Sequence, residues 1–319
     1  MYPSYLEAYN TGSLQEITNK AWEVLGSCSI CPRQCKVNRL NNQKGFCGIG
    51  LRPMIYSFIP HHGEEPPISG TAGSGTIFFS GCNLHCLYCQ NYEFSQLKQG
   101  REVEPEELAL IMLKIQEEGV HNLNFVTPTH ILPQILKALL LAIPKGLKIP
   151  LIYNTSGYEL VSMIKMLEGI IDIYLPDMRY ADSELAKNYS DALDYPKYNQ
   201  TAVKEMQRQV GSAQFDASGI ITRGLIIRHL VLPENISGTE NIMRFIKEEI
   251  SQDTYISLMS QYLPYYRASE FKEISRRLKN QEYQEAKDIL QKYGLTNGWV
   301  QDSFGQERFA GVNIKQSLL

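Results

Sequence analysis

Short apolar runs alternate with amphipathic segments through the middle of the chain. Six of these runs have the length and composition of buried β-strands: 76–80 (TIFFS), 122–126 (NLNFV), 150–154 (PLIYN), 171–175 (IDIYL), 224–232 (GLIIRHLVL) and 255–259 (YISLM). Between them, apolar residues recur at the spacing of amphipathic helices, as over 108–115, 132–139 and 160–167. This alternation favours parallel strands joined by helical crossovers.

Other segments predict further helices. One is expected over 13–25, two polar helices over 182–211, and two amphipathic helices between Tyr266 and Gly294, followed by a short strand at 298–302 (GWVQD). The basic residues of the 182–211 segment are expected on a solvated face: Lys197, Lys204 and Arg208.

The number of strand–helix units decides the fold class. Six units are too few for the closed eight-unit TIM barrel, but they suit an open partial barrel of the same design. We therefore expect an α/β fold, a six-stranded (β/α)6 TIM-like partial barrel, over 75–266. A Cys-rich metal-binding extension is expected over 1–74 and a helical extension over 267–319. In such barrels the chemistry gathers at the carboxyl ends of the strands.

Composition narrows the function classes. Of 319 residues, 43% are hydrophobic and 20% charged, which is ordinary for a globular protein. A net charge of −3 gives no basic excess for phosphate backbones, so no nucleic-acid partner is expected. No apolar run is long enough to span a membrane, and the start MYPSYLEAYNTG lacks the regions of a signal peptide, so we expect a cytoplasmic protein.

Seven cysteines without an export signal indicate reduced thiolates that bind metal rather than disulfides. The first group comprises Cys28, Cys31, Cys35 and Cys47. Four thiolates fit a closed zinc site or a second 4Fe-4S cluster, and the spacing does not choose between them. Such a metal would staple a segment too short for its own core. His61 and His62 are nearby candidates for ligands or substrate contacts.

The second group lies in the loop GCNLHCLYCQN, just after the first predicted strand. Cys82, Cys86 and Cys89 can ligate three irons of a 4Fe-4S cube and leave the fourth iron open, whereas an electron-transfer cluster normally takes four cysteines. An open coordination position distinguishes a catalytic metal site from a structural one. Taken alone, the Cys86–Cys89 pair would equally fit a redox dithiol or half of a zinc site.

This loop resembles the signature of the radical S-adenosylmethionine (SAM) superfamily, in which an aromatic residue precedes the last cysteine, as Tyr88 does here. The resemblance implies that Cys82, Cys86 and Cys89 hold a 4Fe-4S cluster whose open iron takes up SAM. It also implies reductive cleavage of SAM to a 5'-deoxyadenosyl radical and a low-potential electron donor such as flavodoxin or ferredoxin.

Within that superfamily the chain is similar to predicted pyruvate formate-lyase activating enzymes. The similarity is carried by the segments GEEPPISG, GSGTIFFSGCNLHCLYCQNYEFS, NFVTPTH, YNTSGYE and IDIYLPDMRY. It implies an oxidoreductase that acts as an activase, abstracting hydrogen from a glycine of a partner, a glycyl-radical enzyme. Two alternatives stay open: radical modification of another protein, a peptide or a small metabolite, and a non-catalytic iron–sulfur or zinc protein for binding or sensing.

The same resemblance implies a set of cofactor-facing residues. Asn91 would contact the ribose of SAM, and Asp177 with Arg179 resembles an acid–x–lysine pair of activases. The plain alternatives are a turn asparagine and an ordinary ion pair. The matching positions are Tyr88, Asn91, Asn154, Ser156, Asp177, Arg179 and Arg228.

The chain departs from the superfamily pattern at two places. Many members have Gly-Gly-Glu after the second strand, where the backbone receives the amino group of SAM, whereas this chain has VTPTH at 126–130. A backbone carbonyl or the hydroxyl of Thr127 or Thr129 can accept that hydrogen bond instead. His130 is a candidate contact or a structural histidine. Activases tend to have histidine where this chain has Tyr266.

Overall fold

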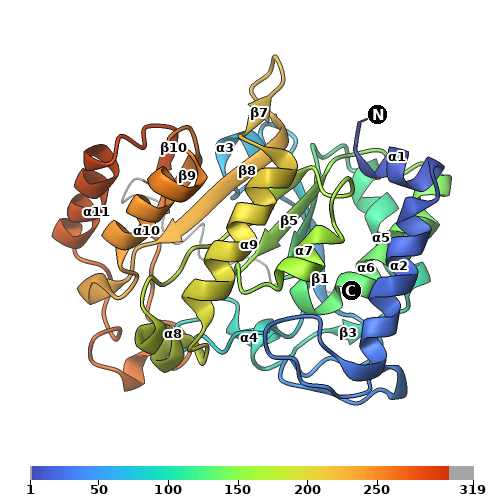
Figure 1. Ribbon diagram of the computed structural model, residues 1–319, viewed down its shortest axis with the longest axis horizontal. Helices are drawn as coiled ribbons and strands as arrows, with labels where there is room; N and C mark the ends of the chain where they lie inside the picture. The colour runs from blue at the N-terminus through green and yellow to red at the C-terminus, as the bar shows by residue number, and fades with distance from the viewer. Residues whose placement is uncertain (1, 302–319) are drawn as a thin grey trace.

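The computed structural model describes residues 2–301, whose strands form one open, mostly parallel sheet (Figure 1). Its middle consists of six parallel neighbours in this order: β2 (Ser74–Phe79), β4 (Leu123–Val126), β5 (Leu151–Thr155), β6 (Ile173–Pro176), β8 (Ile221–Leu230) and β9 (Tyr255–Met259). All six predicted strands and the α/β partial-barrel fold are confirmed. In the described residues the two ends of the sheet do not pair with each other, so the barrel stays open.

The edges of the sheet carry strands of a different kind. β10 (Gly298–Val300) pairs in parallel with β9, which confirms the short last strand. β1 (Met54–His61) pairs antiparallel with β2, and β3 (Arg101–Glu102) with β1. β7 (Gln214–Phe215) forms an antiparallel ladder with β8. β1 lies in the segment expected to be an extension, yet it is hydrogen-bonded into the sheet.

Helices cover the sheet between the strands. The first half contains α1 (Tyr5–Asn10), α2 (Ser13–Glu23), α3 (Pro66–Ser69), α4 (Tyr92–Ser95), α5 (Pro105–Glu117), α6 (Leu132–Ala142) and α7 (Val161–Lys165). The second half contains α8 (Ser183–Ser190), α9 (Tyr195–Val210), α10 (Thr239–Phe245) and α11 (Asn280–Lys292). Figure 1 shows α1 and α2 beside α5 and α6 at one side of the molecule, and α10 with α11 at the other. None of the helices in residues 2–301 is long and apolar enough to cross a membrane.

The expectation of two amphipathic helices after Tyr266 is wrong. Between Tyr266 and Gly294 the described chain has one α-helix, α11, preceded by a short 3-10 turn (Ala268–Glu270) and irregular backbone. The irregular part is fixed by tertiary contacts, because the carbonyl of Ile274 accepts a hydrogen bond from the Tyr262 hydroxyl at 2.6 Å.

The polar face of α9 agrees with the sequence. Its basic side chains are exposed and form surface ion pairs, Lys204 with Glu249 and Arg208 with Glu168 at 2.7 Å. The opposite face of α9 is buried and reaches the ends of β5 and β6, which places its polar residues next to the site described below.

Candidate functional site

The three-cysteine loop leaves the carboxyl end of β2 and is clamped from outside the strands. The backbone N–H of His85 donates to the Ser190 carbonyl at 3.2 Å, and that of Leu87 donates to the Tyr189 carbonyl at 2.9 Å. Both carbonyls belong to the last residues of α8. On the other side the Arg267 N–H donates to the Leu87 carbonyl at 2.9 Å. The loop therefore has a conformation set by two distant segments of the chain.

Each cysteine thiol of this loop has a hydrogen-bonding neighbour within 3.4 Å. Those neighbours are the Leu84 N–H at 3.4 Å from Cys82, the Ser190 hydroxyl at 3.0 Å from Cys86 and the Ser95 hydroxyl at 3.1 Å from Cys89. Burial raises the pKa of Cys89 to about 11, and the nearby charge of Cys86 contributes in the same direction. On this one loop the residues Cys82 and Cys86 are thus buried, and Cys89 is partly buried.

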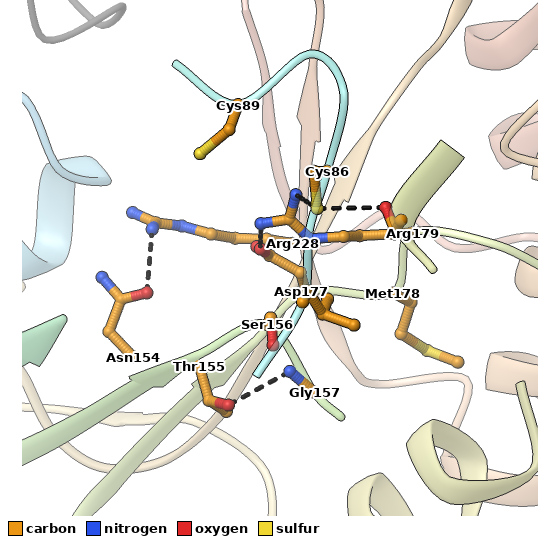
Figure 2. A network of polar contacts seen from close by, with 12 residues as sticks. Cys86, Cys89, Asn154, Thr155, Ser156, Gly157, Asp177, Met178, Arg179 and Arg228 are labelled. Atoms are coloured by element: carbon orange, nitrogen blue, oxygen red, sulfur yellow. Dashed lines mark hydrogen bonds and ion pairs between the residues drawn. The ribbon is translucent and has the colours of Figure 1, made fainter. Parts of the chain in front are cut away.

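This donor set fits a 4Fe-4S cluster. In such a cube each cysteine ligates a different iron, so the sulfur atoms need not surround one point. In residues 2–301 no group of three or more His, Cys, Asp or Glu side chains is arranged to hold a single metal ion. The arginine Arg179 places a cation beside the thiols, with its Nη1 at 3.7 Å from the Cys86 sulfur (Figure 2). A positive charge there favours thiolates.

The carboxyl ends of the strands surround a cleft next to this loop. Its lining includes eight of the residues expected to face the cofactor: Tyr88, Asn91, Thr127, Asn154, Ser156, Asp177, Arg179 and Arg228. Parallel register explains why, since Val126 pairs with Asn154, and Thr155 with Pro176, at the same edge of the sheet. Cys89 lines the same cleft. The cleft thus brings the cysteine loop and the strand ends together.

Asp177 and Arg179 form an ion pair at the end of β6, with Arg179 Nη2 at 2.5 Å from Asp177 Oδ2. α9 supports this pair from behind. The Tyr195 hydroxyl accepts the Arg179 N–H at 3.0 Å and lies 2.8 Å from the Ser156 carbonyl, while Asn199 donates to the Asp177 carbonyl at 2.8 Å. The buried face of α9 therefore positions the ends of β5 and β6.

Arg228 on β8 is held by two carboxylates that sequence reasoning did not single out. Its Nε and Nη2 contact the two carboxylate oxygens of Glu65 at 2.7 Å, and Nη2 also pairs with Glu64. Nη1 lies 3.3 Å from the Asn154 side-chain oxygen (Figure 2). Burial by itself would raise the pKa of Glu64, but the charge of Arg228 and the contacts with His61 and Arg228 together outweigh it, and the pKa falls to about 2. The only sequence signal for these carboxylates was their place in the segment GEEPPISG.

The segment between β4 and α6 has one residue that lines the cleft, Thr127, and two that are buried in the interior, Thr129 and His130. Thr127 lines the cleft with φ at 58°, in the left-handed region that a β-branched residue rarely adopts. Thr129 does not line the cleft, because it is buried and donates to Glu159 at 2.5 Å. His130 is also buried, with Nε2 at 2.8 Å from the Ser80 carbonyl, and burial lowers its pKa to about 4.

Of the remaining candidates, Asn91 and His61 line the cleft, whereas Tyr266 and His62 do not. Tyr266 stacks on Tyr92 with ring centroids 5.2 Å apart, and its φ is 54°. Asn91 precedes α4 without a side-chain cap hydrogen bond. His61 lines the cleft, with Nδ1 at 3.6 Å from Glu64 Oε1. His62 does not line the cleft and lies against Gly73.

The four N-terminal cysteines lie close enough to influence one another. Burial raises the pKa of Cys31 to about 12, and the charges of Cys47 and Cys28 contribute to that rise. Cys35 likewise raises the pKa of Cys47, after the larger effect of burial. All four are free thiols. The polypeptide around them is turned back on itself, because the Lys36 N–H donates to the Cys28 carbonyl at 2.9 Å.

This N-terminal segment packs directly on the three-cysteine loop. The Phe46 ring stacks on His85 with centroids 3.8 Å apart, and Arg33 Nε donates to the Asn83 carbonyl at 2.9 Å. Gly81 has φ at +79°, and a Cβ there would lie 2.6 Å from the Cys47 carbonyl oxygen. The two cysteine groups are therefore neighbours in the fold, although the sequence separates them.

Glu159 leads to a prediction about stability. Burial raises its pKa to about 7, against hydrogen bonds from Thr129, Thr155 and Tyr153 that lower it. The folded state therefore holds the proton more tightly than the unfolded chain does. Its contribution to stability is complete below the unfolded pKa and is lost as the pH rises through the folded pKa. We expect the free energy of unfolding to fall by up to about 3 kcal/mol between about pH 5 and pH 8.

Anaerobic urea unfolding at several pH values measures this dependence. Glu159→Gln should flatten the pH profile, because the amide does not titrate, whereas Glu168→Gln on the exposed surface should leave it as in the wild type. An unchanged pH slope in Glu159→Gln would show that another group causes it.

Comparison with known proteins gives the following matches. The sequence pattern of the Radical SAM superfamily matches residues 76–246. An uncharacterized protein of Methanocaldococcus jannaschii is 32% identical over 86% of this chain and 77% of its own length. A radical SAM methyltransferase of Sphaerobacter thermophilus aligns with 73% of this chain and 67% of its own at 14% identity and a TM-score of 0.48. A domain of a pyruvate-formate lyase-activating enzyme of Bacteroides vulgatus aligns over 62% of this chain and 91% of its own length, at 15% identity and a TM-score of 0.35.

Proposed function

Because the chain belongs to the radical SAM superfamily, we propose that it is an activase, which cleaves SAM and abstracts a hydrogen atom from a glycine of a partner protein. In this proposal Cys82, Cys86 and Cys89 ligate the 4Fe-4S cluster that the family implies. The partner is a glycyl-radical enzyme, and a low-potential donor such as flavodoxin or ferredoxin supplies the electron.

One observation carries the proposal. All five segments that resemble predicted pyruvate formate-lyase activating enzymes contribute to the lining of a single cleft. Each segment supplies at least one lining residue, and examples in chain order are Glu64, Cys89, Thr127, Asn154 and Asp177. Segments far apart in the sequence meet there because the carboxyl ends of parallel strands share one edge of the sheet. A plain cluster carrier has no need of such a cleft.

In this proposal the residues of the chain bind and orient SAM and exclude water from the site. When bound, the reduced cluster supplies the electron that cleaves SAM to methionine and a 5'-deoxyadenosyl radical. Asp177 and Arg179 present fixed charges beside the cysteine loop, and Asn91 and Ser156 offer polar atoms to the ribose and the methionine part of SAM. The Ser156 hydroxyl suits this role because it is buried, faces the cleft and has no hydrogen-bond partner among the described residues. Hydrogen abstraction then converts the radical to 5'-deoxyadenosine and leaves the unpaired electron on the glycine Cα.

Anaerobic assay of the full chain tests this function. The protein is reconstituted with iron and sulfide, reduced with dithionite and given SAM, and 5'-deoxyadenosine is quantified. A second assay adds a peptide from the glycine loop of a glycyl-radical enzyme, deuterated at the glycine Cα, and we expect deuterium in the 5'-deoxyadenosine. A loaded protein that binds SAM without cleaving it would contradict the radical function. Cleavage without deuterium transfer would indicate that the hydrogen atom comes from another protein, a peptide or a metabolite.

We propose further that Cys28, Cys31, Cys35 and Cys47 bind a metal, a zinc ion or a second 4Fe-4S cluster. All four are free thiols, and the charges of their neighbours raise the pKa of Cys31 and of Cys47, so the group would hold four thiolates only where a metal replaces their protons. Cys35→Ala should then remove one metal species and leave the other. With two clusters, iron falls from about eight to about four per chain, and with a structural zinc, only the zinc is lost.

Elemental analysis of the anaerobically purified protein measures both metals at once. Leu40→Ala, an exposed position in the same segment, serves as the control and should keep the wild-type content. Equal metal content in the wild type and Cys35→Ala would rule out the second site.

A further inference from the structure

The Cys86 sulfur has an environment that differs from those of the other two cysteines in its loop. The neighbours of Cys82 and Cys89 are local: Cys82 receives the backbone N–H of Leu84, and Cys89 faces the hydroxyl of Ser95, the last residue of α4, six positions further along the chain. Cys86 instead receives the hydroxyl of Ser190, the last residue of α8, at 3.0 Å. Ser190 is fully buried.

Two buried tyrosines extend this contact away from Cys86. The Tyr180 hydroxyl lies 2.7 Å from the Ser190 hydroxyl, and the Tyr88 hydroxyl lies 2.6 Å from that of Tyr180. Tyr88 lines the cleft, so an unbroken series of hydroxyl groups connects the cleft wall to a cysteine of the loop. None of these side chains was expected to act on the cysteines.

Proton counting fixes the direction of every hydrogen bond in this series. Each hydroxyl carries one proton, and a metal-bound Cys86 carries none. Ser190 must therefore donate to Cys86 and accept from Tyr180. Tyr180 has then used its proton, so Tyr88 must donate to Tyr180. Hydrogen bonds aligned head to tail polarise one another, which strengthens the last donor of the series.

We propose that this hydroxyl series, from Tyr88 through Tyr180 to Ser190, raises the reduction potential of the cluster bound to Cys86. The inference rests on the proposed function, since it requires the cluster. One electron enters from the low-potential donor and no proton moves along the series. The added negative charge spreads onto the cysteine sulfurs, where a donated hydrogen bond stabilises the reduced state more than the oxidised state. Ser190 and Tyr180 are positioning residues in this role.

The series predicts a graded effect. Ser190→Ala removes the donor itself, Tyr180→Phe removes the group that polarises it, and Tyr88→Phe removes only the outermost member. The midpoint potential should therefore become more negative in all three, most in Ser190→Ala and least in Tyr88→Phe. For Ser190→Ala we expect the ratio of reduced to oxidised cluster at a fixed potential to fall at least about threefold, which is ~28 mV for a one-electron couple. Ser190→Thr, which keeps the hydroxyl, should restore the wild-type value.

A potentiometric titration followed by electron paramagnetic resonance measures these potentials on the reconstituted full chain. Two variants on α8 serve as matched controls and should keep the wild-type potential: Ser183→Ala, at an exposed position, and Tyr189→Phe, which deletes a tyrosine hydroxyl outside the series from a ring that packs edge to face on Phe271. A potential for Ser190→Ala equal to that of the wild type would overturn the proposal, as would an equal shift in Tyr180→Phe and Tyr189→Phe.

The outcomes separate this inference from the proposed function. If Ser190→Ala loses its cluster, the potential of Tyr180→Phe tests the proposal in its place, because that substitution deletes one oxygen atom remote from the cysteines. An unchanged potential in Tyr180→Phe would then overturn the proposal. A wild-type chain that forms no reducible cluster would end both proposals. A wild-type chain that cleaves SAM while all variants share its potential would end only the inference about the hydroxyl series.

Discussion

Cys86→Ala should reduce formation of 5'-deoxyadenosine at least about 10³-fold, equivalent to about 4 kcal/mol of activation free energy. Cys86 occupies the centre of the loop, where Ser190 and Arg179 both contact its sulfur. Alanine there leaves two cysteine ligands, which do not retain the cube with its open iron. The measurement is single-turnover quantification of 5'-deoxyadenosine after anaerobic reconstitution and dithionite reduction.

Cys35→Ala provides the matched control for this result. It removes a thiol from the neighbouring group of four cysteines and leaves Cys82, Cys86 and Cys89 intact. With dithionite as the reductant, we expect Cys35→Ala to cleave SAM in a single turnover at a rate far above that of Cys86→Ala. Activity in Cys86→Ala close to that of the wild type would remove the three-cysteine loop from the reaction.

The second large effect concerns Arg228. Arg228→Ala should lower the free energy of unfolding by about 3–5 kcal/mol, because it leaves two buried carboxylates without their cation. The side chains of Glu64 and Glu65 are 7% and 5% exposed, so water cannot replace the guanidinium. Urea denaturation of the purified chain at pH 7 measures the change. Arg228→Lys should recover part of it, since an ammonium group cannot reproduce the bidentate contact with Glu65.

Arg208→Ala is the matched control for the arginine substitution. Arg208 also contacts two carboxylates, Glu168 and Glu205, but its side chain is 52% exposed. Solvent screens that pair, so we expect little change in the free energy of unfolding. Equal losses in Arg208→Ala and Arg228→Ala would contradict the role of burial. Repeating Arg228→Ala in a Glu64→Gln, Glu65→Gln background should recover stability, because the uncompensated charges are then absent.

The clamp on Arg228 also bears on how the cleft binds a ligand. Three of the arginine's nitrogen atoms already contact Glu64, Glu65 or Asn154. The sequence suggested that Arg228 faces the cofactor, and it does line the cleft. Its charge, however, is balanced within the protein. Arg179, which also lines the cleft, contacts the sulfur of a loop cysteine directly, with its Nη1 3.7 Å from Cys86.

The N-terminal segment shows what the spacing of its cysteines could and could not predict. The sequence alone identifies the four cysteines as a group, and in the structure the charges of the other members raise the pKa of Cys31 and Cys47. Their position against the three-cysteine loop could not be predicted, because it depends on the stacking of Phe46 on His85 and the contact of Arg33 with Asn83. Such contacts between separate segments leave no local pattern in the sequence.

The sequence by itself determined those features that depend on short-range patterns, namely the strands and the three-cysteine loop. Hydrophobic runs and helical periodicity predicted the six parallel strands, because burial acts on neighbouring residues with the period of each element. The spacing of Cys82, Cys86 and Cys89 predicted one metal-binding loop, since three thiolates within eight residues must lie together. Parallel strands then imply that polar residues at their carboxyl ends share one cleft.

What only the tertiary structure decided are contacts between residues far apart in the chain. Glu65 reaches Arg228 across 163 positions and Ser190 reaches Cys86 across 104. Thr129, by contrast, turns to buried Glu159 although its position suggested the cofactor. Local sequence fixes which residues can form a strand or a loop, whereas the packing of those elements selects the partner of each polar group. That selection depends on the free energy of the whole fold, and no single segment contains it.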